Sequence, residues 1–243
     1  MLKRGNSMPF SEELKTSIYE YCNNHLPGDD WYLEEFDFIE DLALRKRIIE
    51  EFKGIRFAYK LYEGLDAIDE NLIFEVRSQI LAYASIFEAV IHYILYKYYK
   101  ETPEFHSLQY HTVPTKMGYG EKRINDVKKA LSWKGGELYI FRDQERKKDE
   151  TQVRFDEKCK TAEALGLLHT FTNDQGETID LPSEIISIYG YRNAIHLIAE
   201  RRKGISYELE LSKKAYLRMR PFVDQIKSGL KRDHKGIYAT KEE

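Results

Sequence analysis

The stretch from Asp69 to Lys100, DENLIFEVRSQILAYASIFEAVIHYILYKYYK, decides the expected fold because it carries the most continuous apolar stripe in the chain. It contains neither Gly nor Pro, and its apolar side chains recur every three or four residues. The members of this stripe are Leu72, Val76, Ile80, Ala84, Phe87, Ile91, Leu95 and Tyr98. Such a period is typical of an amphipathic helix. We therefore expect one long helix at the centre of the core.

A single carboxylate interrupts the most apolar part of this stretch. Glu88 lies four residues before His92, so both side chains share one side of the expected helix. Because ionisable groups are rarely buried without a partner, Glu88 needs one. Two interpretations stay open: a structural pair with His92 or with a neighbouring helix, or a place in a functional site.

Helical periodicity also predicts elements on both sides of this stretch. The expected helices cover residues 11–25, 31–61, 121–132, 155–168, 182–202 and 212–230. The charged residues 231–243 are expected to be frayed. Since no internal repeat is present, the expected fold class is all-α, a helical bundle.

The residues from 102 to 154 break this pattern and indicate an insertion with a small β-hairpin. Pro and Gly punctuate residues 102–120, which predicts a long loop. The run Leu138–Phe141 resembles a strand, and the charged residues 142–150 are expected to form a hairpin arm on the surface. Residues 153–155 are expected to supply the return strand, and residues 205–211 another short strand.

Composition excludes several classes of protein. The chain has 243 residues, 42% of them hydrophobic and 33% charged, which is enough for a folded core. Its net charge of −3 provides no overall positive field, so any phosphate site must be a local patch. Cys22 and Cys159 form no disulfide framework. No apolar run is expected to span a bilayer and no signal peptide is expected, which favours the cytoplasm over a membrane.

Familiar catalytic motifs are mostly absent. The chain contains no GxxxxGK[ST], GxSxG or HExxH motif. His106 and His111 share a segment but lack further ligands at a spacing suited to zinc. We therefore expect neither a metal site nor a cofactor.

The segment Tyr189–Leu197, YGYRNAIHL, is the most informative for function. Arg192 and His196 lie four residues apart, which places them on one face of the expected helix. Arg is a permanent planar cation suited to phosphate, and His titrates near neutral pH. Together they can hold and cleave a phosphodiester. The other interpretation is an exposed Arg beside a His that packs in the core.

The residues Arg192-Asn193-Ala194-Ile195-His196 resemble the RN-containing motif of HEPN-domain proteins, all-α modules that include many metal-independent ribonucleases of toxin and antiviral systems. Residues 77–89 look like the early helix of that family, which commonly carries an acidic residue, here Glu88. Residues 162–168 are similar to the helix that precedes the motif helix. The resemblance covers about residues 66–230 apart from the insertion, with residues 1–65 as an N-terminal helical extension and 231–243 as a tail.

This resemblance implies an endoribonuclease in which the RNA 2′-hydroxyl attacks the adjacent phosphorus and leaves a 2′,3′-cyclic phosphate. His196 would transfer protons and Arg192 would stabilise the developing charge. Asn193 would orient His196 or hydrogen-bond the phosphate. Glu88 would reach Arg192 from the neighbouring helix as an auxiliary group.

The resemblance also implies partners: RNA as substrate, a second copy in a homodimer, and an antitoxin or regulatory protein. Only three residues separate Arg192 from His196, whereas the family motif usually has four to six. The alternative is therefore a non-catalytic HEPN-like helical dimer that acts as a nucleotide-binding, RNA-binding or protein-interaction module.

Overall fold

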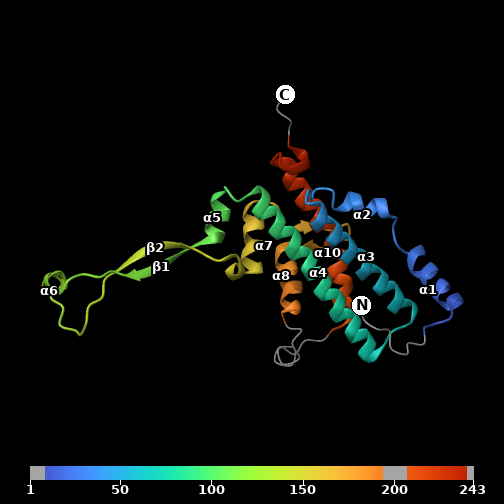
Figure 1. The fold of residues 1–243 in the computed structure, drawn as a ribbon, viewed down its shortest axis with the longest axis horizontal. Helices are drawn as coiled ribbons and strands as arrows, with labels where there is room; N and C mark the ends of the chain where they lie inside the picture. The colour runs from blue at the N-terminus through green and yellow to red at the C-terminus, as the bar shows by residue number, and fades with distance from the viewer. Residues whose placement is uncertain (1–8, 194–206, 240–243) are drawn as a thin grey trace.

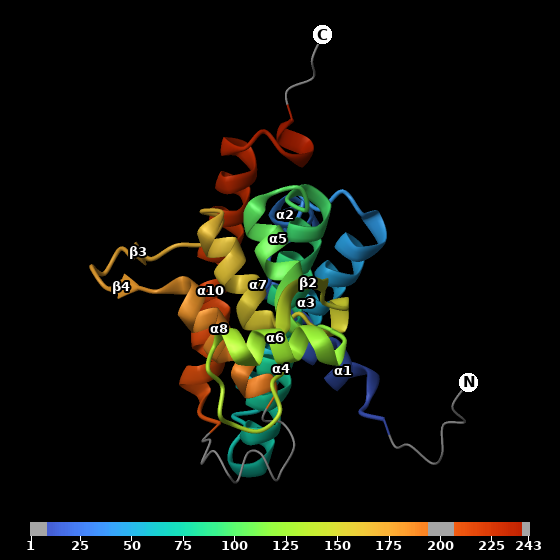
Figure 2. The same cartoon turned by 90° about the vertical axis from the view of Figure 1, so that its left-hand side faces the viewer.

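A computed structural model describes residues 9–193 and 207–239 of the chain. The described residues form a mostly helical body from which a long two-stranded arm extends, with a short helix at its tip (Figure 1). Seen along the arm, the body is a bundle of helices around α4 (Asp69–Tyr98) (Figure 2). The predicted all-α fold with a small β-hairpin is confirmed at this level.

The helix α4 is the predicted central element. Val76, Ile80, Phe87, Ile91 and Leu95 of its stripe are buried. The helices α3 (Leu42–Gly64), α7 (Phe155–Ala164), α8 (Leu181–Arg192) and α10 (Leu209–Arg232) all contact it. Burial of such a stripe is the main driving force for assembling the bundle.

The helix α4 also corrects the expectation that no segment is apolar enough to span a bilayer. By length and composition it passes that criterion within the described residues, with a mean hydropathy of 1.3 over an 18-residue window. However, 61% of that window is buried inside the protein, as in the core helix of a bundle.

Two of the three N-terminal helices share this core. They are α2 (Asp29–Glu35) and α3, whereas α1 (Glu12–Asn24) packs against α3. The single helix predicted for residues 31–61 is wrong, because the chain turns between Glu35 and Leu42. At the restart, the Asp41 side chain accepts hydrogen bonds from the backbone of Ala43 and Leu44, both at 3.0 Å. Residues 1–65 therefore contribute, as far as they are described, to the core that α4 organises.

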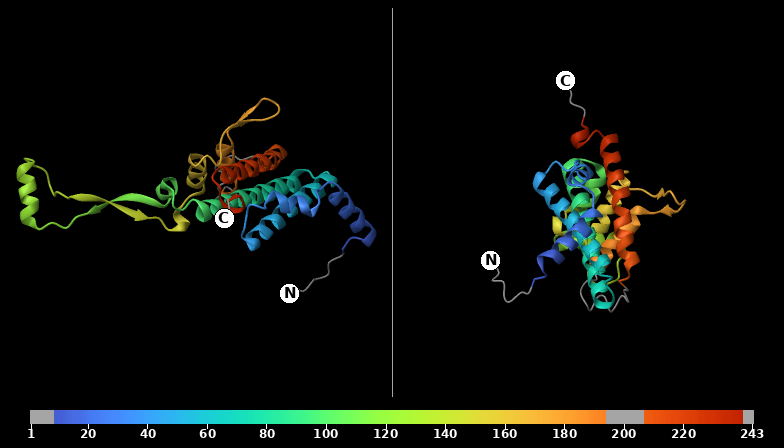
Figure 3. Two further views of the ribbon diagram at one scale, coloured as in Figure 1. Left: turned by 90° about the horizontal axis from the view of Figure 1, so that it is seen from above. Right: turned by 90° about the vertical axis from the view of Figure 1, so that its right-hand side faces the viewer.

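The insertion differs most from expectation. The predicted loop contains α5 (Pro103–Gln109) and β1 (Tyr110–Lys116), and α6 (Glu121–Ala130) follows. The charged segment is itself the strand β2 (Phe141–Lys147), antiparallel to β1 from the pair Tyr110 and Lys147 to the pair Lys116 and Phe141. Residues 153–155 are therefore not the return strand; the short helix η1 (Glu150–Gln152) and α7 occupy this region. Figure 3 shows how far the arm extends from the body.

The C-terminal helices α7 and α8 begin close to the predicted positions but end early, α7 at Ala164 instead of residue 168 and α8 at Arg192 instead of residue 202. Residues 194–202 lie outside the described residues, so the shared helix face of Arg192 and His196 stays a prediction. After α7, a hairpin of β3 (Phe171–Thr172) and β4 (Thr178–Ile179) precedes α8. The strand predicted for residues 205–211 is wrong in its described part, because α10 begins at Leu209. Ser212 lies inside this helix and donates to Gln79 at 2.6 Å.

The chain end is anchored as far as residue 239. Tyr99 donates a hydrogen bond of 2.7 Å to Asp233, and a last short helix, η2 (Gly236–Tyr238), follows. The expectation of a frayed tail from residue 231 is therefore wrong for the described residues.

Candidate functional site

A cleft of about 990 Å³ opens between α4, α7, α8 and the segment around η1. Among the residues that line it are Glu88, His92, Arg154, Lys158, Tyr189 and Asn193. Three predicted site residues meet here, because Glu88 and Asn193 line the cleft and Arg192 binds Glu88. The fourth, His196, lies outside the described residues.

Arg192 is held between two helices. Its Nη1 donates to Glu88 Oε2 of α4 at 2.6 Å and to the Tyr189 hydroxyl, one turn back on α8, at 2.6 Å. The Tyr189 hydroxyl in turn donates to Glu88 Oε1 at 3.0 Å. The predicted contact between Glu88 and Arg192 is thus confirmed, and it closes a triangle of three polar groups.

Packing fixes this triangle in place. The ring of Tyr189 stacks on Phe155 of α7 with 4.1 Å between ring centres, and the Arg192 guanidinium lies 4.9 Å from the centre of the Tyr189 ring. Burial, reinforced by the bond to Glu88, raises the pKa of Tyr189, so the hydroxyl keeps its proton. Upstream, Asp180 caps the first turn of α8 by accepting from the Ser183 backbone at 3.1 Å.

Arg192 retains donors for a ligand. Both of its hydrogen bonds within the described residues use Nη1, and a guanidinium has five N–H donors. The Nε and Nη2 groups are therefore available to a phosphate, and 31% of the side chain is exposed. Asn193 follows at the end of α8 and is exposed, so its amide can contact the same ligand.

A second polar cluster lies in the cleft around His92. Lys158 Nζ is 3.2 Å from His92 Nδ1, and His92 Nε2 is 3.1 Å from Glu150 Oε1. An ammonium group only donates, so Nδ1 accepts and the proton of the neutral ring is on Nε2. Burial and the charge of Lys158 lower the pKa of His92, which keeps it neutral at pH 7.

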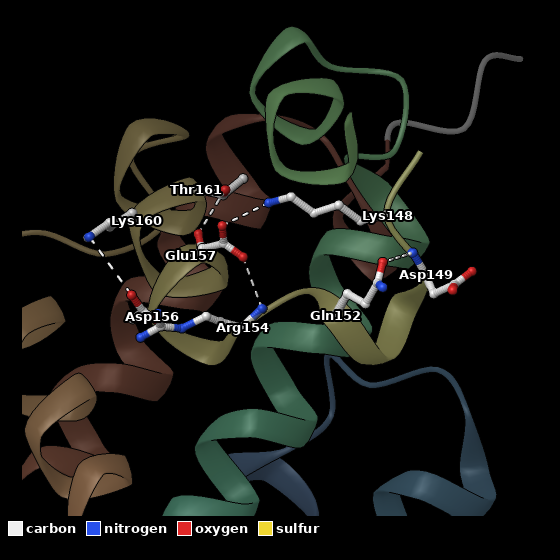
Figure 4. A network of polar contacts seen from close by, with 8 residues as sticks. All are labelled: Lys148, Asp149, Gln152, Arg154, Asp156, Glu157, Lys160 and Thr161. Carbon is white, nitrogen blue, oxygen red and sulfur yellow. Dashed lines mark hydrogen bonds and ion pairs between the residues drawn. The ribbon is translucent and has the colours of Figure 1, made fainter. Parts of the chain in front are cut away.

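The wall of the cleft nearest the arm is tied together by polar contacts (Figure 4). Glu157 accepts from Lys148 Nζ at 2.8 Å and from the Arg154 backbone at 3.0 Å. The Arg154 side chain pairs with Asp156 at 3.0 Å, and Gln152 accepts from the Asp149 backbone at 3.0 Å. These contacts hold the chain in a defined path from β2 into α7.

Tyr189, His92 and Lys158 were not predicted as site residues. Two of them carried a signal: Tyr189 lies three residues before Arg192, and His92 lies four residues after Glu88, so each shares a helix face with a predicted residue. Lys158 carried none, because its place in the cleft depends on how α7 packs against α4. It is nevertheless buried, with 6% of its surface exposed.

Replacing Glu88 by Gln is expected to destabilise the fold only slightly. The sequence suggested a buried pair, but the side chains of Glu88 and Arg192 are 30% and 31% exposed, so solvent screens their attraction. We expect a loss of about 1 kcal/mol in the free energy of unfolding, as for a partly exposed ion pair. Urea denaturation measures this change.

The matched control for that measurement is Glu184→Gln on α8, the helix that carries Arg192. Glu184 is less exposed, at 21%, and it binds two cations of α10, Arg218 and Lys214, the latter at 2.9 Å. Glu184→Gln should therefore lower the free energy of unfolding by more than Glu88→Gln does. A larger cost for Glu88→Gln would contradict this ranking of the two pairs.

The arrangement as a whole presents a cation with free donors, an amide and a tyrosine at the edge of a cleft that holds Lys158 and a neutral His92. Such groups can bind an anionic ligand and stabilise negative charge that develops on it. Within residues 9–193 and 207–239, no group of three or more His, Cys, Asp or Glu side chains is placed to hold a metal ion. No protein-family model, curated protein or solved structure matches the chain.

Proposed function

We propose that this chain is a metal-independent endoribonuclease of the HEPN type that acts as a toxin or antiviral defence effector. The observation that carries the proposal is the triangle of Glu88, Tyr189 and Arg192 at the edge of the cleft. It holds an arginine of the RN motif at a fixed position while its Nε and Nη2 donors face no partner among the described residues. A phosphate that enters the cleft can take up those donors.

The proposed reaction is an internal transesterification of RNA. The 2′-hydroxyl loses its proton and attacks the adjacent phosphorus, the bond to the 5′-oxygen breaks, and that oxygen takes up a proton. Arg192 stabilises the charge on the phosphorane, and Asn193 hydrogen-bonds a phosphate oxygen. His196, assigned from the sequence motif alone, is the proton-transfer group. The products are a 2′,3′-cyclic phosphate and a free 5′-hydroxyl.

The charge distribution of the cleft favours a second candidate, a non-catalytic module that binds RNA, a nucleotide or a protein. Glu88 already neutralises much of the charge of Arg192, and the lining includes the further carboxylates Glu150 and Asp156. A ligand that enters this cleft therefore meets both signs of charge. Whether RNA is cut distinguishes this candidate from the nuclease.

The test is incubation of the purified chain with a labelled single-stranded RNA in EDTA, followed by identification of the product ends. The nuclease should leave 2′,3′-cyclic phosphate ends, and a DNA of the same sequence should stay intact because it lacks the attacking hydroxyl. RNA that stays intact, or products with another end group, would contradict the nuclease.

We further propose a homodimer in which the faces that bear Arg192 meet, as the resemblance to HEPN proteins implies. Light scattering at micromolar concentration should then give twice the 28.8 kDa mass of one chain. The substitution Asn193→Glu should shift the measured mass toward that of a single chain. It places a negative charge on each of the two faces that meet in the dimer. A monomer in the natural protein would contradict this proposal.

A further inference from the structure

The arm differs from the body in charge. Residues 110–147 carry nine Lys and Arg against five Asp and Glu, a net charge of +4, although the whole chain has a net charge of −3. The remaining residues carry 29 against 36. Positive charge is thus concentrated on the part of the molecule that extends farthest from the body (Figures 1 and 3).

The strand register separates the charges of the arm onto two faces. Paired residues of an antiparallel ribbon point to the same side, and neighbours along a strand point to opposite sides. One face therefore carries His111 opposite Arg146, Val113 opposite Gln144, and Thr115 opposite Arg142. The hydrogen bond of 3.2 Å from Thr115 to Gln144 agrees with this assignment. We call these six residues the basic face of the arm, and it contains no carboxylate.

The other face of the ribbon has mixed charge. It carries Asp143 and Glu145 together with Lys116 and Lys147. Glu145 Oε2 lies 3.7 Å from His106 Nε2 of α5, so this carboxylate has a partner outside the ribbon. The ribbon is therefore polarised, with its two arginines on the side that has no acid.

Both arginines of the basic face are available to a ligand. Arg142 and Arg146 are exposed, and neither forms an ion pair with any carboxylate of the described residues. They lie four positions apart on one strand, which corresponds to about 13 Å at the usual rise of a β-strand. Two guanidinium groups at this separation can each bind a phosphate of one extended polyanion.

The arm leads directly into the wall of the cleft. From the end of β2, the chain passes through Lys148 and η1 to Arg154, and both Glu150 and Arg154 line the cleft. The polar contacts of Figure 4 fix this passage, since Lys148 and Arg154 both bind Glu157. The basic face therefore belongs to a segment that joins the wall of the cleft directly.

We propose that the basic face of the arm binds the phosphate backbone of RNA and extends the substrate path from the cleft. This inference rests on the proposed nuclease function and adds a second binding surface to it. The recognition is electrostatic, so it is independent of sequence and sensitive to salt.

A protein partner is the competing occupant, because the arm also exposes apolar side chains near its tip. These are Leu131, Trp133, Tyr139 and Phe141, with 46% to 63% of their surface exposed. They lie at the tip or on the mixed face, and Tyr139 is covered in part by Lys116, whose Nζ is 3.6 Å from its ring centre. The basic face itself has only Val113 as an apolar residue, which favours a polyanion over a protein there.

The experiment measures binding of a fluorescent 2′-O-methyl RNA, which cannot be cleaved because its 2′-oxygen is blocked. In the double variant Arg142→Gln/Arg146→Gln, affinity should fall about tenfold or more at 0.15 M salt, and the slope of log K against log salt should decrease by about 1.4 for two lost contacts to a single strand. The charge-retaining variant Arg142→Lys/Arg146→Lys should bind within about threefold of the natural protein.

The matched control is Lys116→Gln/Lys147→Gln, which removes the same charge from the same ribbon but from its mixed face. Its affinity should change by less than about threefold, and circular dichroism should show that all variants fold. Equal losses in the two Gln variants would overturn the proposal, as would a natural protein that binds no RNA. If the natural protein cuts no RNA but its binding still depends on the basic face, the nuclease is contradicted and the arm surface stands.

Discussion

Replacing Arg192 by Ala is expected to reduce RNA cleavage by about 10² to 10³-fold, as for the loss of one preorganised donor to a developing oxyanion. The structure explains why the effect should be large. Glu88 and Tyr189 each hydrogen-bond Arg192 Nη1 at 2.6 Å and so fix the guanidinium at the cleft edge. A mobile neighbouring side chain would not be held in this position. The measurement is the single-turnover rate of cleavage of a labelled RNA in EDTA.

His196→Ala should lower the same single-turnover rate by about 10² to 10⁴-fold through the loss of proton transfer.

The control for Arg192→Ala is Arg47→Ala. Arg47 is also ion-paired, to Glu51 at 2.5 Å, but it lies on α3, is 67% exposed and does not line the cleft. The RNA cleavage rate of Arg47→Ala should stay within about twofold of the natural rate. An exposed ion pair outside the cleft contributes little to the stability of the fold. A chain with both Arg192→Ala and His196→Ala that still cuts RNA at the natural rate would overturn the catalytic assignment and favour the binding module.

The parts of the fold that the sequence predicted correctly are those in which one face is buried. The stripe of α4 is the clearest case, because burial of Val76, Ile80 and Phe87 on one side imposes the helical period on the sequence. The contact of Glu88 with Arg192 was predicted from two observations. A carboxylate within an apolar helix needs a partner, and the resemblance of residues 192–196 to the HEPN motif implied that Arg192 is this partner.

The arm could not be predicted in the same way, because neither of its faces is buried. The strand β2 reads FRDQERK and is exposed along nearly its whole length, so no alternation of apolar and polar residues marks it. The break between α2 and α3 was missed for the opposite reason. Phe36, Phe38 and Ile39 in the turn are all buried, so the apolar pattern continues through a segment that is not helical.

Glu75 is a buried carboxylate of α4 that takes no part in the cleft, and it makes the stability of the fold depend on pH. Only 4% of its surface is exposed, and no cation of the described residues pairs with it. It accepts a hydrogen bond of 2.5 Å from Gln79, which accepts in turn from Ser212 of α10 at 2.6 Å. Burial raises the pKa of Glu75 to about 7, although the bond from Gln79 opposes the shift.

Replacing Glu75 by Gln is therefore expected to stabilise the fold above pH 7 and to have little effect near pH 4.5. Between these values the folded chain holds a proton on Glu75 that the unfolded chain releases, so the stability of the natural protein falls as pH rises through this window. Above pH 7 the ionised Glu75 lowers the free energy of unfolding by about 3 kcal/mol, at 1.36 kcal/mol for each pKa unit. Glu75→Gln keeps the acceptor for Gln79 without the charge, so its free energy of unfolding at pH 8 should exceed the natural value by up to that amount.

Urea denaturation at pH 4.5, 6 and 8 measures this difference, with Glu70→Gln as the matched control. Glu70 lies on the same helix but is exposed, so its replacement should change stability by less than about 0.5 kcal/mol at every pH. A gain for Glu75→Gln that grows from pH 4.5 to pH 8 identifies the ionised carboxylate as the source of the instability. A change of the same size at all three pH values would instead trace it to side-chain packing, and the buried charge would no longer explain the pH dependence of this fold.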